Sequence, residues 1–102
     1  MKIIVLHPKG ASGGGLAMHA EKLLRRVLDR YCRSVDLIEV KLETSTNVAG
    51  RFDYRCTLKA KLISEDFIRA SASDGEAILA VYRAADRAKF LLEQRLKSEK
   101  KR

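Results

Sequence analysis

Residues 52–62, FDYRCTLKAKL, decide the fold, because their side chains alternate without interruption between two kinds. Charged or hydroxyl side chains stand at every second position. The positions between them hold Phe52, Tyr54, Cys56, Leu58, Ala60 and Leu62. Successive side chains of a β-strand point to opposite faces of a sheet. The stretch therefore predicts a strand with one face in the core and the other in water.

The segments on either side carry the same alternation and predict an antiparallel sheet. The segment VDLIEVKLET, within residues 34–44, alternates charged side chains with Ile38, Val40 and Leu42. A loop over residues 45–51 is expected to join it to the central strand. After a turn near residues 64–66, FIRASA at residues 67–72 repeats the pattern, and its inward positions are Ile68, Ala70 and Ala72. Three consecutive strands of this kind favour a sheet that is covered on one face only.

Two further segments show helical periodicity with basic outer sides. In residues 16–31 the positions opposite the apolar stripe hold His19, Lys22, Arg26 and Arg30, with Arg25 on the flank. In residues 77–96 the apolar stripe is rich in alanine. The positions turned away from it, continued to the chain end, are Arg83, Arg87, Phe90, Gln94, Lys97 and Lys101. Ser73 or Asp74 is predicted to cap this helix, with Glu76 in its first turn.

A fourth strand is predicted at residues 2–6, KIIVL, where Pro8 ends the run. The order β-α-β-β-β-α predicts an α+β fold, with two helices packed on one face of a four-stranded, mostly antiparallel sheet. We expect a single domain over residues 1–97 and a basic C-terminal tail over 98–102.

The glycine-rich stretch at residues 7–16, HPKGASGGGL, raises the question of a phosphate-binding loop. Gly10 and Gly15 have the glycine spacing of such a loop, but Leu16-Ala17 stand where lysine and a hydroxyl residue are required. No catalytic group of residues is evident elsewhere. The chain is therefore predicted not to be an enzyme, to need no cofactor and to take no small-molecule substrate.

Cys32 and Cys56 have no metal-binding spacing, so we expect no metal site and two reduced, part-buried thiols. The chain has 102 residues and no apolar run near the roughly 20 residues that a bilayer requires. We therefore expect a cytoplasmic protein without a membrane partner.

The net charge of +8 indicates a polyanionic partner. From Val81 to the chain end there are eight basic residues and only three acidic ones. The basic residues are Arg83, Arg87, Lys89, Arg95, Lys97, Lys100, Lys101 and Arg102, and the acidic residues are Asp86, Glu93 and Glu99. Such a row suits nucleic-acid phosphates, since lysine and arginine release condensed counterions from them. Phe90 lies within the row, where it could stack on an unpaired base or, alternatively, contact the first helix.

These segments together resemble the ribosome hibernation-promoting factor family, also called the ribosome-associated inhibitor or sigma-54 modulation protein family. The resemblance covers about residues 16–97. It rests on the element order, the strands VDLIEVKLET and FDYRCTLKAKL, the run IRASA, and the alanine-rich helix with Ala85-Asp86-Arg87. Long members carry an extra C-terminal domain that pairs ribosomes, so the resemblance is to the short form.

The resemblance implies a factor that binds the small ribosomal subunit and silences translation in the stress response. Members occupy the channel for messenger and transfer RNA and contact rRNA through basic residues. The implied RNA-binding residues of the second helix are Arg83, Arg87, Lys97 and Lys101, beside the possible stacking residue Phe90. Those of the first helix are Lys22, Arg25, Arg26 and Arg30.

Two other functions fit the same pattern. The order α-β-β-β-α is that of a double-stranded-RNA-binding module, which reads duplex shape through phosphates and 2′-hydroxyls. A protein-interaction regulator of the sigma-factor modulation type would instead present the same charges to an acidic protein surface.

Overall fold

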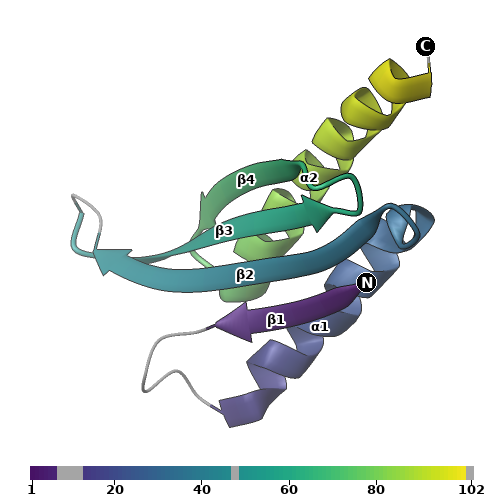
Figure 1. The fold of residues 1–102 in the computed structure, drawn as a ribbon. Coiled ribbons are helices and arrows are strands. Elements are labelled where there is room, and N and C mark those ends of the chain that lie inside the picture. Colours follow the sequence, from purple (N-terminus) through teal and green to yellow (C-terminus); the bar gives the residue numbers. More distant parts are fainter. Residues whose placement is uncertain (7–12, 47–48, 101–102) are drawn as a thin grey trace.

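A computed structural model describes residues 1–6, 13–46 and 49–100 of the chain (Figure 1). The elements are β1 (Lys2–Leu6), α1 (Gly13–Leu28), a 3₁₀ turn (Asp29–Tyr31), β2 (Val35–Thr46), β3 (Phe52–Leu62), β4 (Phe67–Asp74) and α2 (Ala77–Lys100). This order confirms the predicted β-α-β-β-β-α arrangement. Within the part of the chain so described, no helix is both long enough and apolar enough to cross a membrane.

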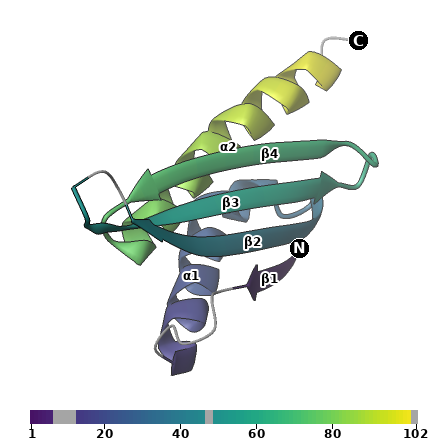
Figure 2. The same cartoon turned by 90° about the vertical axis from the view of Figure 1, so that its left-hand side faces the viewer.

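The four strands form one sheet in the order β1-β2-β3-β4. β1 runs parallel to β2, with Lys2 opposite Leu37 and Leu6 opposite Lys41, whereas the two later pairs are antiparallel. A parallel pair needs a crossover connection, and α1 supplies it. Figures 1 and 2 show α1 and α2 on the same face of the sheet, so the mostly antiparallel, one-sided architecture is confirmed.

The core lies between the sheet and the two helices. The inward side chains of β3 from Cys56 to Leu62 are buried, as are Ile68, Ala70 and Ala72 of β4. Opposite them, α2 contributes mainly small buried side chains, which are Ala80, Val81, Ala84, Ala85, Ala88 and Leu92. Alanine on both sides of the contact lets the helix backbone lie close to the strands.

Phe52 departs from the predicted alternation, because its side chain is 70% exposed. The prediction that it lies in the core was wrong. Phe52 begins β3 at the end of the β2–β3 hairpin, and Figure 1 shows this end projecting past α1 and α2, so neither helix covers it. Alternation decides on which side of a sheet a residue lies, but burial also requires a second layer at that point.

The element ends also differ from the prediction at several places. β2 continues to Thr46, two residues into the expected loop. α1 begins at Gly13, inside the glycine-rich stretch, of which residues 7–12 lie outside the described part of the chain. α2 continues to Lys100, although the basic tail was expected to begin at residue 98. The backbone N–H of Glu76 donates to Asp74 Oδ1 at 3.1 Å, so Asp74 holds the entry to α2, and Glu76 precedes the helix rather than lying in its first turn.

The two cysteines are free thiols in unlike surroundings, which corrects the expectation of two part-buried groups. Cys32 follows the 3₁₀ turn and is exposed, whereas Cys56 is fully buried in β3. Burial raises the pKa of the Cys56 thiol to about 12, because the thiolate would lose its hydration.

We predict that one thiol per chain reacts quickly with a thiol reagent in the native protein. Cys32 is exposed and accessible, whereas Cys56 is buried and stays protonated at neutral pH. The absorbance of the thiolate that the reagent releases should correspond to one rapidly reacting thiol per chain in the native protein, and to two thiols per chain in denaturant. Cys32→Ser should abolish the fast phase, and a remaining fast equivalent in that variant would contradict the burial of Cys56.

The stability of the fold should fall as the pH rises above about 9. Folded Cys56 keeps its proton to higher pH than the unfolded chain does, so the native state binds more protons there and alkali favours unfolding. The loss from this group should be about 1 to 2 kcal/mol between pH 7 and pH 10. Urea unfolding of the wild type and of Cys56→Ala at both pH values measures it. An equal loss in the variant would assign the effect to other groups.

Candidate nucleic-acid interface

The outer side of α2 carries a continuous row of exposed side chains. We call it the α2 row; it consists of Arg83, Arg87, Phe90, Gln94 and Lys97. All five lie on the solvent side of the helix, as the periodicity predicted, because the apolar stripe opposite them is held against the sheet. Lys101, the last residue predicted for this row, lies outside the described residues.

Two arginines of the α2 row reach across to β4. Arg83 Nε lies 3.3 Å from Asp74 Oδ2, an ion pair that offsets part of its charge. Arg87 Nη1 donates a hydrogen bond of 2.8 Å to the Ser71 carbonyl oxygen. A carbonyl is neutral, so Arg87 keeps its full charge and is held in place at the same time.

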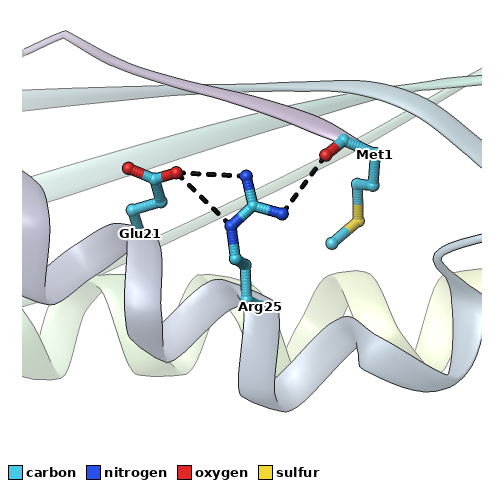
Figure 3. A network of polar contacts seen from close by, with 3 residues as sticks. All are labelled: Met1, Glu21 and Arg25. Atoms are coloured by element: carbon cyan, nitrogen blue, oxygen red, sulfur yellow. Dashed lines mark hydrogen bonds and ion pairs between the residues drawn. The ribbon is translucent and has the colours of Figure 1, made fainter.

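A second row of basic residues lies on α1 and on the 3₁₀ turn that follows it. We call it the α1 row; it consists of Lys22, Arg25, Arg26 and Arg30, all exposed. Figure 3 shows the guanidinium of Arg25 between two partners, Glu21 and Met1. Its Nη2 and Nε are 3.1 Å and 3.3 Å from Glu21 Oε1, and its Nη1 donates to the Met1 carbonyl at 3.4 Å. Arg25 therefore joins α1 to the start of β1 and presents a reduced net charge.

The two rows together span the helical layer from one edge of the sheet to the other. Arg25 is anchored at β1 and Arg87 at β4, and these strands are the two outer strands of the sheet. Within the described part of the chain, Lys22, Arg26, Arg30, Arg87 and Lys97 form no ion pair with a carboxylate. The surface thus keeps several uncompensated positive charges on both helices.

Tyr31, in the 3₁₀ turn after α1, belongs to the hydrophobic core. It is buried, and burial raises the pKa of its hydroxyl, with a smaller contribution in the same direction from Glu93 of α2. Arg30 acts on the hydroxyl in the opposite direction. Both side chains lie close enough to influence the hydroxyl, yet it has no partner at hydrogen-bonding geometry among the described residues.

Phe90 is 60% exposed, so most of its side chain is open to solvent. An aromatic ring held between arginine and glutamine on a basic helix can stack on an unpaired base, and this role remains a prediction.

The sheet's open face adds an aromatic residue that our sequence reasoning missed. Phe67 is 51% exposed at the start of β4, and Lys59 Nζ lies 4.4 Å from the centre of its ring. Arg69 stands opposite Lys59 in the β3–β4 register, so the charges gather around the ring. Arg69 was already expected on the outer face of the sheet, and the inward positions of β4 imply that Phe67 points outward too, so this signal could have identified Phe67.

No family model and no curated protein sequence matches the chain. Several solved structures share its fold, and two of them match almost all of the chain. The N-terminal domain of Protein Y from Thermus thermophilus is 22% identical, with a TM-score of 0.67, and the match covers 92% of this chain and 98% of that one. A ribosomal subunit interface protein from Coxiella burnetii is 19% identical, with a TM-score of 0.65, and the match covers 100% of both chains. The arrangement of strands and helices is therefore one that these proteins also adopt.

We predict that Asp74→Asn raises the affinity of the chain for single-stranded RNA. The variant releases Arg83 from its ion pair, while the asparagine oxygen can still accept the Glu76 N–H and hold the start of α2. The gain should be about two- to fivefold for a polyuridylate probe at 50 mM salt. Glu43→Gln removes the same charge on the open face of the sheet, beside Lys41, and serves as the control. An equal gain in both variants would indicate an effect of net charge alone.

Proposed function

We propose that this chain binds the small ribosomal subunit through its helical layer and silences translation while bound. The proposal rests on one observation above all, the basic surface that the α1 and α2 rows form across the helical layer. The fold lends support, because one protein that shares it is named a ribosomal subunit interface protein. A partner of this kind would keep the protein in the cytoplasm.

The mechanism is exclusion by occupancy, and no covalent bond is made or broken. Lysine and arginine side chains of the two rows neutralise rRNA phosphates and release their counterions. Lys22, Arg26, Arg30, Arg87 and Lys97 have the largest share, because no carboxylate among the described residues forms an ion pair with them. The body is elongated, with extents of 50 × 28 × 20 Å, and its bulk excludes messenger and transfer RNA from the channel.

Part of this surface is selective for a particular binding geometry, because an intramolecular hydrogen bond already holds one of its side chains in place. Arg87 is held by the Ser71 carbonyl, so binding a phosphate costs it little additional side-chain entropy. Lys22 and Lys97 supply charge without a fixed direction. We therefore expect Arg87 to position the protein on rRNA, and the lysines to contribute mainly to the salt-dependent attraction.

A double-stranded-RNA-binding module is the main alternative, because α1-β2-β3-β4-α2 has its element order. Such a module would bind any RNA duplex through phosphates and 2′-hydroxyls. Competition between purified ribosomes and a plain duplex of 20 base pairs separates the two functions. Displacement from ribosomes by an equimolar duplex would favour the alternative.

We predict that the chain sediments with small subunits at 50 mM salt and is released at 300 mM. If about six phosphates are contacted, the affinity should fall on the order of 1,000-fold between 50 and 200 mM salt. Arg87→Glu should weaken binding at least about tenfold at low salt, since it removes one phosphate contact and adds a repulsive charge. Sedimentation through a sucrose cushion, followed by immunoblotting, measures both effects.

Lys41→Glu is the matched control, because it changes the net charge from +8 to +6 as Arg87→Glu does, but on the open face of the sheet. Arg26→Glu tests the α1 row independently, without loss of an intramolecular contact to β4. Circular dichroism must show that each variant is folded. Equal weakening by Lys41→Glu, or binding that does not change with salt, would overturn the proposed surface.

A further inference from the structure

The outer strand β4 has an open edge whose hydrogen-bonding groups can be assigned. The Leu62 N–H donates to the Asp66 carbonyl at 2.8 Å where the β3–β4 pairing begins. Hydrogen-bonded pairs alternate along an antiparallel ladder, so the even-numbered residues of β4 turn their backbone groups toward β3. The N–H and C=O groups of Phe67, Arg69, Ser71 and Ser73 therefore point away from the sheet.

A groove of about 360 Å³ lies between this edge and the C-terminal half of α2. Its strand side is formed by Phe67, Ile68 and Arg69, and its helix side by Leu91, Gln94 and Arg95. Figures 1 and 2 show α2 crossing behind β4 and extending beyond it, so that the C-terminal half of the helix lies beside the open edge of the strand. The volume is in the range of sites that hold small ligands or peptide side chains.

Two arginine contacts bound the groove. Arg87 Nη1 reaches the Ser71 carbonyl at 2.8 Å at one end, and Arg95 Nη1 reaches Asp66 Oδ2 at 2.7 Å at the other. The helix rises about 12 Å between these arginines, at 1.5 Å per residue. Four extended residues cover about 13 Å, so the space between the contacts matches a short strand.

We propose that the edge of β4 between Asp66 and Ser71 binds an acidic, extended peptide segment of another protein as an added strand. The open N–H and C=O groups of Phe67 and Arg69 pair with its backbone, as in other cases of strand addition beside a helix. Apolar side chains of the peptide contact Ile68 and Leu91 in the groove. The side chains at the intervening positions of the peptide lie on the open face of the sheet, where their carboxylates are close to Arg69.

Charge selects this occupant over a second copy of the chain. Antiparallel pairing of two β4 strands around residue 69 would set the Arg69 side chains of the two copies against each other, on chains that each carry a net charge of +8. Arg69 forms no ion pair within the described residues, so an incoming carboxylate meets an uncompensated charge. A nucleic acid would satisfy the charge, but its backbone lacks the alternating donors and acceptors that the edge offers.

The test uses the full chain and a fluorescein-labelled hexapeptide of alternating glutamate and valine with blocked termini. Fluorescence anisotropy should show saturable binding. A peptide that carries N-methyl groups on the alternate residues whose N–H groups face β4 should bind at least about tenfold more weakly, because it cannot form the hydrogen bonds of the ladder. Replacing its glutamates by lysines should abolish binding. Equal affinity for the N-methylated peptide would overturn the proposal.

Two substitutions of Arg69 separate the contribution of its backbone N–H from that of its side-chain charge. Arg69→Ala removes the charge, and Arg69→Pro also removes the outward N–H, so the proline variant should bind about fivefold more weakly than the alanine variant. Ser73→Pro, at an outward position beyond the Arg87 contact, is the proline control, and Phe90→Ala is the control outside the groove; both should bind as the wild type does. If a proline variant does not fold, the N-methylated peptide on the wild type decides the question.

Two further outcomes would overturn the proposal. A single-stranded RNA oligonucleotide that binds at this edge and loses affinity in Arg69→Pro, while the peptide does not bind, would assign the groove to nucleic acid. Self-association in sedimentation equilibrium that Arg69→Pro abolishes would assign the edge to a second copy. No ribosome takes part in the assay, so its result is independent of the function proposed above.

Discussion

Close packing of the alanine-rich side of α2 on the sheet is the contact on which the other features depend. Ala80, Ala84, Ala85 and Ala88 are fully buried against inward side chains that include Ala60, Ala70 and Ala72 of the sheet. A larger side chain in this layer would push the helix outward, and cores tolerate such insertion poorly. Because the helix lies so close, arginines on its flank can reach the backbone and carboxylates of β4.

This proximity gives the arginines of α2 two unlike roles. Arg83 and Arg95 form ion pairs with Asp74 and Asp66, near the two ends of β4, and their charges are partly offset. Arg87 meets a neutral carbonyl between them and remains available to an external anion. The surface proposed for rRNA and the groove proposed for a peptide meet at this residue, so the two partners would use neighbouring but separable contacts.

The element order, the one-sided sheet and the outward positions of both helices could be predicted because they depend on local periodicity. The period of 2 in residues 52–62 and the helical spacing around Arg87 each give the direction of a side chain from its position in the chain. Element ends were less certain: β2 runs on to Thr46 and α2 to Lys100, because pairing and packing extend elements past the point where local patterns end.

The sequence by itself determined on which side of the sheet the strand residues lie, and that the outer helix sides are basic. It did so because these properties follow from residue type and spacing alone. Tertiary structure decided that Phe52 lies beyond the cover of the helices, that Arg25 and Arg87 are anchored at opposite edges of the sheet, and that Phe67 and Leu91 border one groove. Each of these depends on a contact between residues far apart in the chain, such as Arg95 with Asp66, and such contacts exist only once the helices are docked on the sheet.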